Sequence, residues 1–229
     1  RDFCLSRGLG DVYKRQMRRA CFDGRDCMCV GETSFVTTQN AGSVVDDGRE
    51  LDMLFQFDVM DMDGGETKWD ARPFDLMRFK QIISAWQAAI GWNTLFWGNH
   101  DQPRPVSRFG CTRTETLRRR STTCLATAMY LLRGTPFLYQ GEEIGMTNWR
   151  PERADMYEDV QTRYTYAHTA LKQSEEVRLH RLWRSSRDSA RTPVQWDDSE
   201  NAGFTTGKPW FYVNQNYKDI NVAKQEADP

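Results

Sequence analysis

Apolar segments of two kinds alternate along the chain from residue 17 onward. Segments rich in apolar residues at Leu51–Phe57 and Trp92–Trp97 predict short strands. Between them, apolar residues recur at helical spacing from Phe79 to Ile90, which predicts an amphipathic helix that Gly91 ends. Strands that alternate with helices in this way are typical of β/α units built around a parallel sheet.

The alternation extends on both sides of these elements. Cys29–Val30 predicts a short strand that ends at Gly31–Glu32, and Thr135–Tyr139 predicts a fourth strand. Between the last two strands, a helix is expected from about Glu115 to Leu132 and ends at Gly134. Its apolar side is expected to hold Leu117, Cys124, Leu125, Ala128 and Leu131.

The pattern loosens after the fourth strand. Glu158–Arg184 predicts one or two polar helices, and Arg187–Asn221 is rich in Pro, Gly, Asn and aromatic residues, which favours ordered surface loops. The chain therefore offers four strand–helix units, whereas a closed (β/α)8 barrel needs eight. The fold class expected is α/β, as a partial TIM barrel.

Residues 1–16 differ from the rest of the chain, since they lack a starting Met and have no sustained period. We expect them to be a cloning or assembly scar, or disordered, and we assign the domain to residues 17–229.

The charge balance narrows the possible partners. The 229 residues contain 31 Lys and Arg against 32 Asp and Glu, which argues against a nucleic-acid or membrane-surface role. The run Arg118–Arg120, with Glu115 nearby, is expected to be an exposed helix face. No apolar run approaches the roughly 20 residues that a membrane helix needs.

The six cysteines are expected to be free thiols, since no secretion signal opens the chain. Cys27-Met28-Cys29 is the one close pair, and without companion histidines it is weak evidence for a metal. We therefore expect a cytoplasmic protein with no metal site and no cofactor.

The segment Leu95–Arg104 carries the strongest chemical signal. An apolar run, Leu95-Phe96-Trp97, ends abruptly in an amide, an imidazole, a carboxylate and a guanidinium. A barrel builds its active site from groups delivered at the carboxyl ends of its strands. The segment is therefore a candidate site.

Cleavage of a glycoside with retention needs an acid and a nucleophilic carboxylate. Two acids follow predicted strands, Glu32 after Gly31 and Asp101 beside His100. Taken alone, Val30-Gly31-Glu32 also fits a surface turn, and the His–Asp pair also fits a turn beside a core histidine.

Four segments together resemble the α-amylase superfamily, glycoside hydrolase family thirteen, in the family's order. They are Val30–Thr33, Phe96–Arg104, Gly134–Asn148 and Ser186–Trp196, the last followed by Ala202–Thr205 and Pro209–Trp210. The nearest pattern is that of oligo-1,6-glucosidases, a group that includes trehalose-6-phosphate hydrolases and enzymes acting on sucrose. The resemblance implies a retaining α-glucosidase, with the chain covering about barrel strands five to eight.

The same resemblance assigns roles to individual residues. Glu32 matches the general acid/base, and Asp101 matches the carboxylate that stabilises the transition state. His100 and Arg187 match ligands of the non-reducing glucose, the latter against the alternative of a surface ion pair with Asp188. Glu142 and Glu143 match a pair that holds the strand-end loops by hydrogen bonds.

The sequence departs from the family at two places. Gly98 stands where many relatives carry an amide, and no Gly-x-Arg-x-Asp segment precedes Glu32 to supply the nucleophile. Asp23 and Asp26 match the linker before the acid strand instead. We therefore expect a fragment that lacks the first half of the barrel and the C-terminal β-sandwich, and that is inactive and poorly stable alone.

The partner expected is a small oligosaccharide, α-1,6-linked in the leading interpretation, with no nucleic acid and no membrane. The runner-up activities are those of a trehalose-6-phosphate hydrolase or a sucrose-acting relative. A non-catalytic barrel or a non-functional remnant would be a protein of another class. The oligomeric state is left open.

Overall fold

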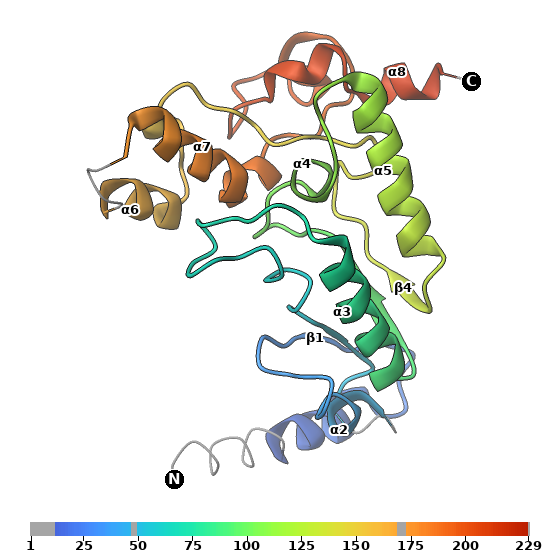
Figure 1. Ribbon diagram of the computed structural model, residues 1–229. Helices are drawn as coiled ribbons and strands as arrows, with labels where there is room; N and C mark the ends of the chain where they lie inside the picture. The colour runs from blue at the N-terminus through green and yellow to red at the C-terminus, as the bar shows by residue number, and fades with distance from the viewer. Residues whose placement is uncertain (1–11, 47–49, 169–172, 229) are drawn as a thin grey trace. The chain divides into compact units, whose positions relative to one another are not determined.

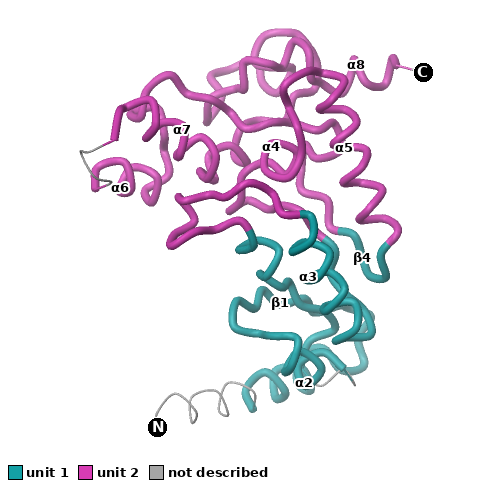
Figure 2. The backbone as a smooth tube through the Cα atoms, viewed as in Figure 1, with its two compact units in different colours: residues 1–62, 76–95, 132–136 teal, residues 63–75, 96–131, 137–229 magenta. Residues whose placement is uncertain are grey.

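The computed structural model describes residues 12–46, 50–168 and 173–228. The chain divides into two compact units, and each consists of segments that are distant in sequence (Figure 2). Unit 1 comprises residues 1–62, 76–95 and 132–136, and unit 2 comprises residues 63–75, 96–131 and 137–229.

Unit 1 contains the four strands, of which β2, β3 and β4 are shorter than predicted. β1 (Val30–Glu32) pairs in parallel with β2 (Met53–Phe55), and β3 (Asn93–Leu95) pairs in parallel with β4 (Gly134–Pro136). A side chain joins the two pairs, because the hydroxyl of Thr94 donates to the carbonyl of Leu54 at 2.6 Å. The four predicted strands are thus confirmed, and they are neighbours in chain order.

The core of unit 1 packs helices against these strands. Its helical segments are η1 (Arg18–Phe22), α2 (Gly42–Val45) and α3 (Leu76–Ala89), which confirms the helix predicted before Gly91. The buried cluster consists of Ala41, Val45, Leu54, Trp86 and Ile90. Trp86 is fixed within it, since its indole Nε1 donates to Asp58 Oδ2 at 2.7 Å.

Unit 2 contains the remaining helices. They are α4 (Pro105–Phe109), α5 (Glu115–Tyr130), α6 (Val160–His168), α7 (Glu175–Ser185) and α8 (Val222–Glu226). α6 and α7 lie side by side (Figure 1), which confirms the polar helices expected there. Short turns of 3₁₀ helix connect the rest, namely η3 (Ala154–Met156), η4 (Arg187–Ala190), η5 (Glu200–Gly203) and η6 (Gln215–Lys218).

The long C-terminal loop region is ordered by aromatic packing. Trp149 lies at its centre, with Tyr157 and Phe211 edge-on to it at ring distances of 5.9 and 5.4 Å. Tyr212 stacks on the same indole at 5.0 Å. Aromatic pairs of these geometries stabilise a core beyond the area that they bury. They explain how a segment with little regular structure keeps a defined path.

The buried face of α5 differs from the prediction. Leu131 is 81% exposed and Cys124 is exposed, whereas Arg118 is 4% exposed. Arg118 donates through Nη1 to the carbonyls of Ile144 and Gly145, each at 2.8 Å. The expectation of an exposed Arg118–Arg120 face is therefore wrong for Arg118, because the loop that packs on that side of the helix presents two carbonyls that accept from its guanidinium.

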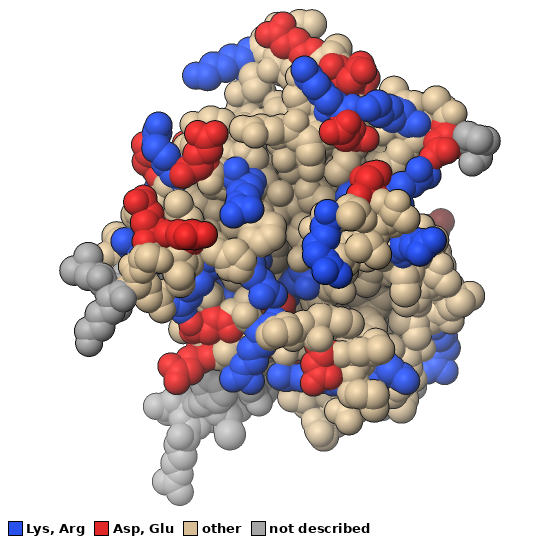
Figure 3. Space-filling model, turned by 45° about the horizontal axis from the view of Figure 1, so that its top comes forward, with Lys and Arg blue, Asp and Glu red and all other residues tan. Residues whose placement is uncertain are grey.

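Other expectations concern the cysteines, residues 1–16, membrane helices and the surface charge. Within the described ranges, the five cysteines other than Cys4 are free thiols. Of the segment 1–16, residues 1–11 lie outside the described part, and residues 12–17 are helical. No helix among the described residues is long and apolar enough to cross a membrane. On the face shown in Figure 3, Lys and Arg are interspersed with Asp and Glu.

Candidate active site

The segment after β3 turns sharply at Asn99. The amide oxygen of Asn99 accepts from the backbone N–H of Asp101 at 2.8 Å, and its carbonyl accepts from the N–H of Gln102 at 3.3 Å. A short polar side chain that bonds two residues ahead in this way forms an Asx-turn. The turn presents the side chains of His100 and Asp101 outward, with 61% and 39% of their surfaces exposed.

The buried side chain of Arg104 anchors the segment. It is 1% exposed, and its Nε and Nη2 donate to the carbonyls of Ser189 and Ala190 at 3.0 and 3.3 Å. Its backbone N–H donates to Asn148 Oδ1 at 2.7 Å. Burial lowers the pKa of Arg104 to about 10, so the guanidinium remains charged at neutral pH. This one side chain ties the Asx-turn to η4, which carries Arg187.

Two arginines from the η4 region meet the carboxylate of Asp101. Arg187 Nη1 and Arg191 Nη2 donate to the same oxygen, Oδ1, at 2.9 and 2.8 Å. Arg191 also donates through Nε to the carbonyl of His100 at 3.2 Å. The other oxygen, Oδ2, lies 3.6 Å from His100 Nε2. The structure thus brings together three of the four predicted site residues and adds Arg191.

The electrostatics keep this carboxylate ionised. Partial burial raises the pKa of Asp101, but the hydrogen bond from Arg187 and the charges of His100 and Arg187 outweigh it, so the pKa lies below its usual value. An ionised carboxylate with one oxygen held by two guanidinium groups can stabilise positive charge that develops on a sugar ring. It is poorly suited to donate a proton.

Arg187 does not pair with Asp188 as a surface ion pair would. Its Nε lies 2.8 Å from Asp159 Oδ1, and its Nη2 donates to Gln161 Oε1 at 3.4 Å. Asp188 is 1% exposed and accepts instead from the backbone N–H groups of Glu158 and Asp159. Lys68 also donates to Gln161 Oε1. Arg187 and Arg191 thus contact Asp101 directly, and Lys68 shares the acceptor Gln161 with Arg187.

Glu32 belongs to unit 1 and is the last residue of β1. It lies opposite Phe55 of β2, and its side chain is exposed. A Cβ at Gly31, the preceding residue, would overlap Leu51 Cδ1, so a larger residue there would require that side chain to move. The carboxyl thus projects from the carboxyl end of a strand, as an acid of a barrel active site does.

The Glu142–Glu143 pair behaves differently from the expectation. Glu143 Oε2 accepts from the N–H of Gly141 at 2.7 Å, a loop bond of the kind expected. Glu142 Oε1 is buried without a hydrogen-bond partner among the described residues. Burial raises the pKa of Glu142 to about 8, despite the opposing charge of Arg104.

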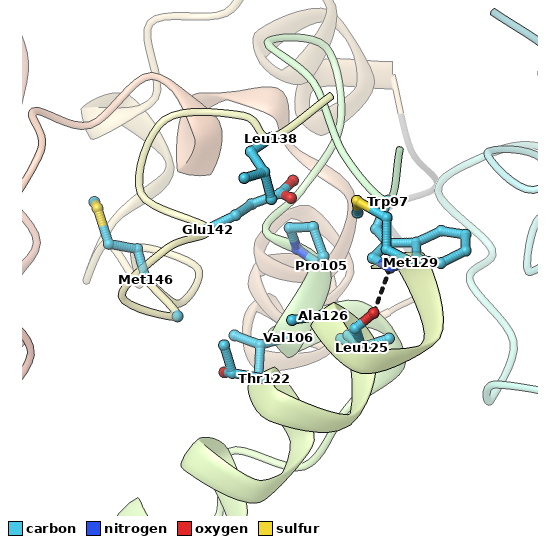
Figure 4. A pocket seen from close by; sticks show the side chains of 11 residues that line it. Trp97, Pro105, Val106, Thr122, Leu125, Ala126, Met129, Leu138, Glu142 and Met146 are labelled. Carbon is cyan, nitrogen blue, oxygen red and sulfur yellow. Dashed lines mark hydrogen bonds between the residues drawn. The ribbon is translucent and has the colours of Figure 1, made fainter. Parts of the chain in front are cut away.

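A small cavity of about 40 Å³ adjoins Glu142 (Figure 4). Its lining is otherwise mainly apolar and includes Trp97, Val106, Leu125 and Met129, and the Trp97 indole donates to the carbonyl of Leu125 at 2.8 Å. A Cβ at Gly98 would lie 2.9 Å from Glu142 Oε1. The residue that departs from the family pattern is therefore adjacent to the unpartnered carboxyl.

No three His, Cys, Asp or Glu side chains in the described part of the chain are grouped so that they could hold a metal ion.

Comparison with known proteins assigns the family. The sequence matches the α-amylase catalytic domain over residues 10–229. The chain belongs to this family. The match starts within the segment 1–16 and continues to the last residue. The resemblance found in the sequence is therefore confirmed, and the fold of the family is the (β/α)8 barrel to which the four parallel strands belong.

The relatives of this α-amylase-family chain are longer than it. It is 46% identical to the oligo-1,6-glucosidase of Bacillus cereus, over 92% of this chain and 38% of that protein. It is 43% identical to the trehalose-6-phosphate hydrolase of Bacillus subtilis, with the same coverage. The solved trehalulose synthase of Pseudomonas mesoacidophila MX-45 is 40% identical, with a TM-score of 0.87 over 96% of this chain and 40% of that chain. The chain thus spans about two fifths of these relatives.

Sequence reasoning missed three residues of this site. Arg104 stands inside the motif, and its burial was not foreseen although a guanidinium after a buried strand is a signal. Arg191 lies four residues beyond Arg187, and nothing in the sequence indicates that it contacts Asp101. Asp159 lies in a polar stretch with no motif, so no signal in the sequence pointed to it.

Proposed function

We propose that this chain is part of a retaining α-glucosidase that hydrolyses short α-glucosidic oligosaccharides, preferably α-1,6-linked ones. The observation that carries the proposal is the Asp101 carboxylate, half-exposed and held ionised by Arg187 and Arg191. The family membership and the names of the relatives support glycoside hydrolysis.

In this proposal, Glu32 protonates the leaving glycosidic oxygen and later deprotonates the attacking water. Asp101 stabilises the oxocarbenium-like transition state, and His100 and Arg187 hold hydroxyl groups of the non-reducing glucose. Retention also requires a nucleophilic carboxylate about 5 Å from the acid. No segment of this sequence matches the family's Gly-x-Arg-x-Asp pattern. We therefore expect the 229-residue chain alone to lack turnover.

The test uses the 229-residue chain and, in parallel, the protein encoded by the whole reading frame around it. We expect the longer protein to release glucose from isomaltose as the α-anomer, followed by NMR. Glu32→Gln and Asp101→Asn should each lower kcat by about 10²–10⁴-fold, and the exposed Glu226→Gln should not. Release of the β-anomer, or full activity of either variant, would refute the assignment.

The same assay separates the alternatives. A trehalose-6-phosphate hydrolase would cleave trehalose 6-phosphate in preference to isomaltose, and a sucrose-acting relative would convert sucrose. The proteins named trehalose-6-phosphate hydrolase and trehalulose synthase among the relatives give both alternatives support. A longer protein inactive on every one of these substrates would favour a non-catalytic barrel or a remnant.

A further inference from the structure

Arg187 lies between two carboxylates that differ sharply in exposure. Its Nη1 is 2.9 Å from Asp101 Oδ1, on a side chain that is 39% exposed. Its Nε is 2.8 Å from Asp159 Oδ1, on a side chain that is 4% exposed. The exposed carboxylate belongs to the proposed catalytic group. The buried one has no part in the chemistry proposed above.

Asp159 is itself held rigidly. Its second oxygen, Oδ2, accepts from the backbone N–H and from the hydroxyl of Thr162, at 2.8 and 2.7 Å. These two hydrogen bonds to Oδ2, with the Arg187 ion pair at Oδ1, restrict the rotamer of Asp159 and favour its ionised form. The pKa of Asp159 lies below its usual value because the bonds from Thr162 and the charge of Arg187 outweigh the effect of burial.

Asp159 and Thr162 also form hydrogen bonds with the residues on either side of Arg187. The hydroxyl of Thr162 lies 2.9 Å from the hydroxyl of Ser186, the residue before Arg187. The backbone N–H of Asp159 donates at 3.0 Å to Asp188 Oδ2, from the residue after Arg187. Thr162 and Ser186 are completely buried. A fixed framework therefore surrounds the base of the Arg187 side chain.

We propose that Asp159 is a positioning residue that holds the guanidinium of Arg187 in the orientation in which Nη1 meets Asp101. Its catalytic relevance rests on the proposed glucosidase function, although its effect on Arg187 does not. A guanidinium is a planar fork, so an ion pair at Nε on one edge restricts where Nη1 can point. Asp159 acts through Arg187 and contacts no substrate.

The alternative is that Asp159 only competes with Asp101 for one cation. The two possibilities predict opposite changes when the charge of Asp159 is removed. If Asp159 competes, Asp159→Asn strengthens the pair between Arg187 and Asp101 and lowers the pKa of Asp101. If Asp159 positions Arg187, the same substitution loosens that pair, and the loss of this pair raises the pKa of Asp101 by more than the removal of the Asp159 charge lowers it. The sign of the shift therefore decides between them.

The experiment follows the carboxyl carbon of Asp101 by ¹³C NMR across a pH titration of the 229-residue chain, assigned with Asp101→Asn. We expect Asp159→Asn to raise the pKa of Asp101 by about half a unit to one unit, since an opposite charge at this distance lowers it by about 1–3. Arg187→Gln should raise it further. The charged or titratable groups that also face Arg187, Asp101 or Asp159 are Lys68, His100, Asp188 and Arg191, and all four stay unchanged in the variants.

A second variant and a control keep the result decisive if Asp159→Asn fails to fold. Thr162→Val removes the bond from the hydroxyl to Asp159 without changing any charge, so it should raise the pKa of Asp101 by a smaller amount. Asp155→Asn removes an exposed carboxylate, paired with Arg153, and should leave it unchanged. A fall or no change in the folded Asp159 and Thr162 variants would overturn the proposal.

The outcome is independent of whether the chain has glucosidase activity. The titration needs no turnover, so a rise in the pKa of Asp101 supports the positioning role even where no α-glucoside is cleaved. In the longer protein, Asp159→Asn should lower kcat more than it raises KM, because Asp101 acts in the transition state. An inactive longer protein with the expected pKa shift would refute the proposed function alone.

Discussion

Arg104 and Asp101 stand three residues apart and meet opposite environments. Arg104 is 1% exposed and donates to loop carbonyls, so its charge is used to hold two segments together. Asp101 is 39% exposed and its charge faces outward, with Arg187 and Arg191 on one oxygen. The same motif thus contains a buried charge that holds two segments together and a part-exposed charge that two arginines contact.

Glu142 provides a prediction at this scale. Its pKa of about 8 in the folded chain exceeds the ordinary value of 4.5, so the protonated form is the one that folding favours. The free energy of unfolding should therefore fall as pH rises from about 5 to 8, by at most about 1.4 kcal/mol per pH unit from this group. Glu142→Gln should remove that part of the pH dependence.

The measurement is urea unfolding of the chain and of Glu142→Gln at several pH values between 4.5 and 9. The variant should gain stability relative to the parent across pH 5–8, by a few kcal/mol in total, and the difference should level off above about pH 8. Glu226→Gln, on the exposed end of α8, serves as the control. A difference that is constant with pH would show that Glu142 is not protonated in the fold.

At the scale of elements, α5 illustrates how a helix is oriented by its neighbours. Its apolar residues predicted one face, yet Arg118 and Met129 are the residues buried on it. The loop at Ile144–Gly145 carries two carbonyls that need donors, and a buried unpaired carbonyl is costly. Arg118 supplies both bonds, while Glu115 pairs with its other edge.

Arg118→Leu should therefore destabilise the chain by about 1–3 kcal/mol, because it leaves the carbonyl of Gly145 without its donor, whereas the carbonyl of Ile144 still accepts from Gln225 Nε2 at 2.8 Å. Arg120→Leu, two residues further on the exposed side of α5, should change stability by less than about 0.5 kcal/mol. Denaturant midpoints of the two variants test the difference. Equal midpoints would mean that the Arg118 bonds contribute nothing to stability.

At the scale of the whole molecule, the chain combines a net charge of −1 with a calculated isoelectric point near 6.4. Large apolar side chains are exposed, among them Phe35, Leu131 and Trp210 at 78%, 81% and 67%. Charge repulsion between copies is weakest where the net charge approaches zero, and exposed apolar surface then promotes association.

We expect solubility to be lowest at pH 6–7 and to rise at pH 8.5, where the chain is more negative. Light scattering of the chain at fixed concentration and varied pH measures this. Adding 0.5 M NaCl at pH 8.5 should restore part of the scattering, since salt screens the repulsion. Scattering that is independent of pH would assign the association to apolar contacts alone.

The strands and helices could be predicted because their signals are local. The run Trp92–Trp97 and the helical spacing from Phe79 to Ile90 depend only on neighbouring residues, and both elements are present. β2, β3 and β4 are shorter than the predicted segments because pairing partners, which lie far away in sequence, determine where a strand ends.

The candidate site could be predicted only where a residue belongs to a motif. Asp101 and His100 stand beside Phe96-Trp97, and Arg187 opens a loop block of recognisable pattern. Arg191 and Asp159 carry no such pattern. The hydrogen bond from Arg191 to Asp101 joins residues 90 positions apart. Arg104 links the same two segments, because it donates from the Asx-turn segment to the carbonyl of Ser189 in η4.

By itself the sequence determined the family, the alternation of strands and helices, and the chemical groups of the candidate site. These are properties of residue type and local order, which require no knowledge of distant contacts. Only the tertiary structure decided which charges are buried and which oxygen of Asp101 the two arginines hold. It likewise decided that Asp159 forms an ion pair with Arg187. Desolvation and ion pairing depend on distances between segments that no sequence pattern specifies.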